Sequence, residues 1–166
     1  GIVFQNRILS GPTAATISTG DDPAGFAAID SNFWVRYPGG ANSIDIRIKT
    51  QLNELPSINP CTFQVGMLGV PGAIAPARTG LETAYGAYFE ADNTSNFWQC
   101  VTRTNAGSFT KQATTVAFEA ITAQVLRIQF DGTNESGYGT GFNFYIDSVF
   151  VMHIGTTLPP TGSNYS

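Results

Sequence analysis

The segment Phe142-Asn-Phe-Tyr-Ile-Asp-Ser-Val-Phe-Val-Met-His-Ile154 gives the clearest indication of how this 166-residue chain folds. Two hydrophobic arms flank Asp147-Ser148, where a two-residue turn needs positive φ angles and usually takes Asn-Gly or Asp-Gly. Serine fits such a turn less well than glycine, so we expect a turn that is strained or longer than two residues. The segment as a whole predicts a β-hairpin.

Strand periodicity extends outward from this hairpin through most of the chain, and helical periodicity is convincing nowhere. In Ser43-Ile-Asp-Ile-Arg-Ile-Lys49, isoleucines alternate with charged residues, which is typical of a half-buried strand. Turn clusters separate the apolar runs, as at Asp92-Asn-Thr-Ser-Asn96 and Asp131-Gly-Thr-Asn134. Further strands are predicted at 26–37, 62–68, 84–91, 97–102, 114–120 and 124–130.

The fold class that follows is all-β, a two-sheet antiparallel β-sandwich of jelly-roll or concanavalin-like type. At 166 residues the chain suits one domain, which buries roughly 70% of its unfolded surface. We expect residues 1–20, rich in Ser, Thr, Gly and Ala, to form an N-terminal arm. Residues 21–166 are predicted to form the sandwich.

Charge and hydropathy exclude some classes of partner. Charged residues make up only 12% of the chain, the net charge is −4, and no run of Lys or Arg occurs. Nucleic acid and membrane surfaces are therefore not expected partners. No segment approaches the roughly 20 apolar residues that span a bilayer, and the first residues lack the pattern of a signal peptide, although a start at Gly1 leaves processing open.

Several motifs together resemble a β-sandwich module of tailed-bacteriophage virion proteins, found in head decorations, tail fibres and spikes. They are Gly86-Ala-Tyr-Phe-Glu-Ala-Asp92, Asn96-Phe-Trp-Gln-Cys-Val-Thr-Arg103, Val125-Leu-Arg-Ile-Gln129, Phe144-Tyr-Ile-Asp-Ser-Val-Phe-Val151 and Leu158-Pro159. The resemblance covers roughly residues 26–160. It implies a structural protein of the virion surface, a capsid decoration (cement) or fibre module that acts through subunit packing.

The resemblance also implies an assembly. The family's pattern continues beyond the Leu-Pro step into strands that complete a sheet, whereas the sequence here stops at Ser166. We expect either further residues beyond Ser166 or a strand supplied by a neighbouring subunit, for which residues 1–20 are a candidate. An open edge strand is a template for pairing with another chain. The expected partners are sister subunits in a homotrimer and other virion proteins.

An alternative function is recognition of host surface glycans by a fibre or spike module. Tyrosine and tryptophan rings stack on the apolar faces of sugars. The candidate ligand-binding residues are Tyr138, in the Gly-rich segment Ser136-Gly-Tyr-Gly-Thr140, followed by Trp98 and Tyr88. Aromatic residues at strand spacing more often pack in the core, so the structural interpretation competes with the functional one at each position.

A glycan hydrolase is a third and weaker possibility. Glu90 and Asp92 lie two apart on a predicted strand and point to one face, as an acid/base pair requires. Glucanases of this fold class carry a further carboxylate where this chain has Ser95. Without it the double displacement does not run, so we expect no enzymatic activity.

Metal and cofactor sites are not predicted. His153 is the only histidine and alternates with apolar neighbours, as a structural strand residue does. The acidic segment from Asp131 to Glu135 lacks the spacing of a calcium loop. Cys61 and Cys100 allow one disulfide, but their apolar surroundings favour two buried thiols.

Overall fold

The computed structural model describes residues 35–36, 44–52, 55–56, 62–69, 85–105, 108–134, 136–159 and 164–165. All of them belong to one compact unit, Ser31–Ser166. The expected N-terminal arm, Cys61 and most of the strand predicted at 26–37 lie outside the described residues.

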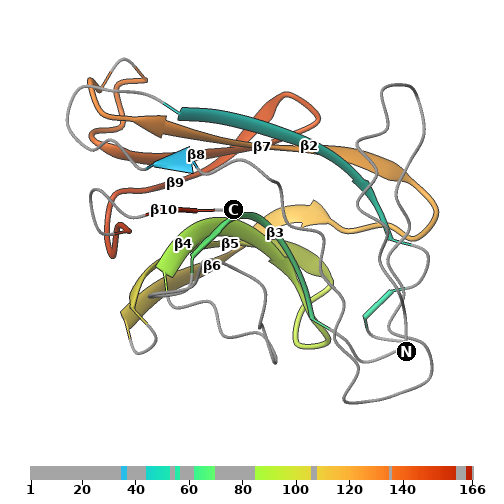
Figure 1. Ribbon diagram of the computed structural model, residues 1–166. Helices are drawn as coiled ribbons and strands as arrows, with labels where there is room; N and C mark the ends of the chain where they lie inside the picture. The colour runs from blue at the N-terminus through green and yellow to red at the C-terminus, as the bar shows by residue number, and fades with distance from the viewer. Residues whose placement is uncertain are drawn as a thin grey trace. The chain divides into compact units, whose positions relative to one another are not determined.

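The described strands form two four-stranded antiparallel sheets, drawn as two layers in Figure 1. One sheet has the order β2-β7-β8-β9 and the other the order β3-β4-β5-β6, and β1 and β10 make a separate short pair. The two-sheet antiparallel β-sandwich predicted from the sequence is confirmed. The strands are β1 (Val35–Arg36), β2 (Ile44–Gln51), β3 (Phe63–Gly69), β4 (Tyr85–Ala91), β5 (Phe97–Asn105), β6 (Ser108–Ala117), β7 (Ala123–Asp131), β8 (Gly141–Ile146), β9 (Val149–Ile154) and β10 (Asn164–Tyr165).

The chain crosses between the sheets twice in this region. It leaves β2 for the four consecutive strands β3 to β6, then returns to β7, which pairs with β2 along its whole length from Ile44↔Phe130 to Gln51↔Ala123. Each sheet is otherwise built of sequential hairpins. This order places strands that are far apart in the sequence, β2 and β7, side by side.

The core lies between the two sheets and is rich in aromatic rings. Phe89 of β4 packs edge-on against Phe144 of β8, with ring centroids 5.2 Å apart. Trp98 of β5 packs against Phe89 and Phe118 in similar geometry. Edge-to-face pairs of this kind add to the free energy of apolar burial. The alternate residues of each strand point away from this core, and they supply the candidate sites described below.

The hairpin of β8 and β9 closes with a two-residue turn. Ile146 pairs with Val149, and Asp147 and Ser148 both have positive φ, at 50° and 70°. Positive φ at both central residues is the signature of a type I′ turn. The turn is therefore two residues long, and both of its central residues adopt a positive φ although neither is glycine. Asp147 is also tied to β7, because its Oδ1 accepts a hydrogen bond of 2.8 Å from the Val125 amide.

The strand predicted at 114–120 was placed too late in the sequence. The structure has β6 from Ser108 to Ala117, and its first half pairs with β5, as in Arg103↔Phe109 and Val101↔Lys111. The segment Ser-Phe-Thr-Lys-Gln lacks a clean apolar alternation, so its strand conformation comes from pairing with β5 and not from its own pattern. Cys100, on β5, is a buried free thiol, and burial raises its pKa.

Candidate functional sites

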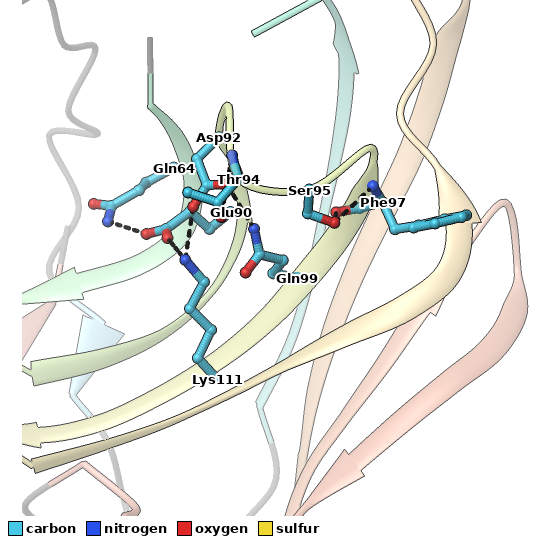
Figure 2. A network of polar contacts seen from close by, with 8 residues as sticks. All are labelled: Gln64, Glu90, Asp92, Thr94, Ser95, Phe97, Gln99 and Lys111. Carbon is cyan, nitrogen blue, oxygen red and sulfur yellow. Dashed lines mark hydrogen bonds and ion pairs between the residues drawn. The ribbon is translucent and has the colours of Figure 1, made fainter. Parts of the chain in front are cut away.

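The first candidate site is a polar network on the face of β4 that points away from the core. Phe89 and Ala91 enter the core, so Glu90 and Asp92 project from the opposite side, as the period-two pattern predicts. The ammonium group of Lys111, on β6, lies between them, 2.6 Å from Glu90 Oε1 and 2.7 Å from Asp92 Oδ2. The network joins β4 to β6 across the intervening strand β5 (Figure 2).

The remaining carboxylate oxygens also have donors. Gln64 Nε2, on β3, donates to Glu90 Oε2 at 2.6 Å. Asp92 Oδ1 accepts from Gln99 Nε2 at 2.9 Å and from the Thr94 amide and hydroxyl at 2.8 and 2.6 Å. Figure 2 shows these side chains converging on the two acids. Donors from β3, β5 and β6 and from the turn after β4 thus hold the two carboxylates.

The electrostatics of this network favour permanent charge. Burial raises the pKa of Asp92, but hydrogen bonds from Lys111 and Thr94 outweigh burial and bring the pKa to about 2. Burial lowers the pKa of Lys111, while its hydrogen bonds to Asp92 and Glu90 raise it above the usual value on balance. A general acid needs a carboxyl group whose pKa lies near the working pH. Asp92 is instead held ionised, as the anion of a cross-strand ion pair.

Ser95 occupies the position where the glucanase pattern has its further carboxylate. Its hydroxyl accepts a hydrogen bond of 3.0 Å from the Phe97 amide and donates to the Phe97 carbonyl at 3.2 Å. The serine therefore shapes the entry to β5, on the side of the turn away from Lys111 in Figure 2. The described contacts give Glu90, Asp92 and Ser95 roles in holding strands and a turn together.

Two of the three candidate ligand-binding aromatics are buried. Trp98 is 1% exposed, lies among Phe63, Phe89 and Phe118, and donates from Nε1 to Gln124 Oε1 at 2.8 Å. Tyr88 is 2% exposed, and burial raises the pKa of its hydroxyl to about 12. Neither ring offers an open face on which a sugar could stack.

The third candidate, Tyr138, is 56% exposed and lies in the loop between β7 and β8. Its ring stacks on Phe150 of β9 with centroids 4.7 Å apart and an angle of only 6° between the planes. It also lies over His153, at 5.8 Å and 25°. The second candidate site is therefore an aromatic surface on the outer side of the β2-β7-β8-β9 sheet. We define this aromatic surface as Tyr138, Phe150 and Tyr145.

The loop that carries Tyr138 is held by hydrogen bonds to acidic and amide side chains. Asp131, at the end of β7, accepts from the Ser136 amide at 2.8 Å. Asn134 has a positive φ of 62°, and its Oδ1 accepts from the Gly139 amide. Gly137 and Gly139, on either side of the tyrosine, have φ angles of 78° and 97°. Glycine adopts such angles at little cost, so the sequence around Tyr138 suits this loop.

The sheet beneath the loop continues the aromatic surface. Tyr145 packs edge-on against Phe150 at 5.7 Å, and the guanidinium of Arg127 lies 4.7 Å above the Tyr145 ring. Arg127 is also paired with Asp45, with Nε to Oδ1 at 2.8 Å and NH2 to Oδ2 at 2.7 Å. The hydrogen bond from Arg127 lowers the pKa of the Asp45 carboxyl.

Sequence reasoning identified Tyr138 but missed Phe150, Tyr145 and Arg127. The hairpin register places Tyr145 opposite Phe150, and Arg127 lies opposite Tyr145 on β7. In the alternation Phe144-Tyr145-Ile146, the first and third residues are apolar and lie in the core, so the pattern indicates that Tyr145 faces outward. Nothing in the sequence shows that the loop folds back so that Tyr138 covers Phe150.

Within the described part of the chain, no group of three or more His, Cys, Asp or Glu residues is placed to hold a metal ion. None of the described segments is a helix long and apolar enough to cross a membrane. Burial lowers the pKa of His153, the Asp131 carboxylate partly offsets this, and the ring nitrogen Nδ1 lies 2.8 Å from Asn143 Oδ1.

Comparison of the sequence with protein families and curated proteins identifies no relative. No protein-family model matches the chain. No curated protein is significantly similar to it in sequence.

Proposed function

We propose that this chain is a structural module of the virion surface of a tailed bacteriophage, a capsid decoration or fibre module that acts through packing between subunits. The proposal begins from the sequence resemblance described above. The quoted motifs fall on β4, β5, β7 and the β8–β9 hairpin of an antiparallel sandwich, which is the fold that the resemblance implies.

The observation that carries the packing role is the composition of β9. Among the described strands, β9 pairs with β8 alone and so forms an edge of its sheet. Its sequence, Val-Phe-Val-Met-His-Ile, contains no Lys, Arg, Asp, Glu or Pro. Natural proteins protect exposed edges with charges, proline or bulges because an unprotected edge pairs with other chains. β9 has a bulge at Val151, where its register with β8 shifts, but it lacks the charges and prolines, and this lack supports a partner along it.

The other edge of the same sheet provides a contrast. β2 carries Asp45, Arg47 and Lys49 at alternate positions, and all three are exposed. Charges on an edge strand oppose pairing with a second chain. The difference between the two edges therefore supports a specific contact at β9 and solvent at β2.

The proposed occupant of the β9 edge is a segment of a second copy of this chain. If two β9 strands paired with each other, the contact would be isologous and produce a dimer. A trimer requires a heterologous contact, in which β9 of one subunit meets a different segment of the next. We propose the trimer, with other virion proteins as further partners.

The polar network favours this structural role over catalysis. Both candidate acids are ion-paired with Lys111 and fully supplied with hydrogen bonds from neighbouring strands. Such a network stiffens a sheet, whereas an acid/base pair needs one carboxyl group that is protonated at the working pH.

The test is the location of the protein on intact particles. An antibody to this chain is applied to purified particles of the phage that encodes it, and labelled particles are imaged by electron microscopy. Label across the head or along the fibres is the expected result. Particles without label, with the protein present in the surrounding lysate, would contradict the proposal.

A second candidate function is the binding of host surface glycan. The specific observation in its favour is the exposed ring of Tyr138, which is fixed on Phe150.

A further inference from the structure

We propose that the outward face of Tyr138 is the stacking platform for a neutral pyranose unit of a surface glycan. The inference develops the second candidate function and does not depend on the packing role of β9. It assigns a position and a chemical class of ligand to the aromatic surface.

Tyr138 is held in place by its contact with Phe150. The two rings are parallel with centroids 4.7 Å apart, so Phe150 covers one face of the tyrosine, and His153 is a second ring neighbour at 5.8 Å. More than half of Tyr138 nevertheless remains exposed, which leaves surface of the side chain available to a ligand. A side chain that is already held in its binding orientation loses little conformational entropy when a ligand arrives.

Open space lies beside the two glycines that flank Tyr138 in the sequence. A Cβ atom added at Gly137 or Gly139 would meet no atom within 4 Å apart from its own chain neighbours. The loop backbone on either side of Tyr138 is therefore not covered by other described parts of the fold, which leaves room for a flat, bulky ligand such as a sugar ring.

Arg127 and His153, two basic side chains near Tyr138, offer a ligand no unpaired positive charge. Arg127, beyond Tyr145, is paired with Asp45. The Asp131 carboxylate accepts hydrogen bonds from the loop that carries Tyr138. Burial lowers the pKa of His153, whose ring contacts that of Tyr138. An anionic sugar would find no unpaired cation among these groups, so the chemistry favours a neutral ring with an apolar C–H face.

The experiment compares binding of neutral oligosaccharides by the wild-type protein and by variants of Tyr138. The neutral probes are defined oligosaccharides of glucose, galactose or N-acetylglucosamine, and oligogalacturonic acid is the anionic counterpart of galactose. Binding is measured by saturation-transfer NMR and titration calorimetry. Tyr138→Ala should weaken binding at least tenfold, and Tyr138→Phe should keep it within about threefold because the stacking face is retained. Phe109→Ala is the matched control, since Phe109 is 49% exposed on β6 of the other sheet and should leave binding unchanged.

Three results would overturn the inference. The wild-type protein could bind none of the neutral sugars, Tyr138→Ala could bind as tightly as wild type, or only anionic sugars could bind. Thermal unfolding of each variant shows whether the fold is intact. Light scattering separates this inference from the packing role, because Tyr138→Ala should keep the oligomeric state of the wild-type protein. Loss of the oligomer in that variant would instead identify the surface as a subunit contact.

Discussion

The turn between β8 and β9 has Asp147-Ser148 at the two positions that usually hold Asn-Gly or Asp-Gly. Both have positive φ, a conformation that costs an L-residue other than Asn or Asp about 1 kcal/mol. The cost at Asp147 is compensated by its hydrogen bond with the Val125 amide, whereas the Ser148 side chain makes no such bond to any residue that the structure describes.

Ser148→Gly should therefore stabilise the fold by about 0.5–1 kcal/mol, measured as a higher midpoint of urea unfolding. Asn93→Gly is the control, because Asn93 lies in the turn after β4 without a positive φ and should gain nothing. A midpoint for Ser148→Gly at or below the wild-type value would contradict the strain assigned to this turn.

Lys111 provides a prediction about acid stability. Lys111→Met would leave the buried Glu90 and Asp92 without their cation and should lower the free energy of unfolding by about 1–3 kcal/mol at pH 7. Lys49→Met, on the exposed face of β2, should change it by less than about 0.5 kcal/mol.

The pH dependence of the stabilisation by Lys111 follows from the pKa of Asp92. Its pKa is about 2 in the folded protein and near 3.8 when unperturbed, so its ion pair stabilises the fold above pH 4. That contribution, about 1–2 kcal/mol, is lost as the pH falls through 2. The difference in urea midpoint between wild type and Lys111→Met should therefore narrow between pH 4 and pH 2. A constant difference across this range would show that Lys111 stabilises by packing and not by charge.

At the residue scale, the sequence predicted the positions of single side chains but few of their contacts. The shared face of Glu90 and Asp92 follows from strand periodicity. Lys111 could not be predicted as their partner, because β6 begins earlier than its apolar pattern indicates and its register with β5 contains bulges. Tyr138 was identified by its Gly-rich loop, whereas its stacking on Phe150 depends on hydrogen bonds made by Asp131 and Asn134.

At the scale of elements, strands with a clear apolar alternation were predicted well. The predicted bounds of β2, β3, β4 and β7 differ from the structure by a residue or two, because isoleucine, valine or aromatic residues mark their inner faces. β6 was displaced because its first half is polar. Its conformation is imposed by hydrogen bonding to β5, which a local pattern does not record.

Gly66 in β3 gives an element-scale prediction. Its φ is 145°, and a Cβ atom there would lie 2.7 Å from both the Ala87 carbonyl oxygen and Ile128 Cδ1. Gly66→Ala should destabilise the fold by about 3 kcal/mol, because it adds backbone strain and a clash with β4 and the facing sheet. Gly137 also has a positive φ, but a Cβ atom there would meet open space. Gly137→Ala should therefore lower the free energy of unfolding by only about 1 kcal/mol. Equal losses of unfolding free energy for the two variants would contradict the close approach at Gly66.

At the scale of the whole molecule, composition and turn spacing predicted a sandwich, but they did not predict the order of its strands. The pairing of β2 with β7 joins segments nearly 80 residues apart, and no local signal specifies it. The distribution of charge over the sheet edges likewise becomes visible only when the strand order is known. This distribution is the basis on which β9 is proposed as the contact edge.

Val149→Lys tests that edge. Val149 is 63% exposed at the start of β9, so the variant should fold with nearly unchanged stability. A charge at this position should oppose pairing along the edge and weaken the oligomer at least tenfold, as measured by sedimentation velocity over a range of concentrations. Gln51→Lys places the same charge at the exposed end of β2 and should leave the oligomer intact. Equal effects of the two variants would argue against a contact specific to β9.

The central claim is that the protein acts through packing between its own subunits. The measurement that tests it most directly is the mass of the intact gene product in solution, by light scattering coupled to gel filtration. The account predicts a single stable species at three times the subunit mass. A monodisperse monomer at all concentrations would contradict it.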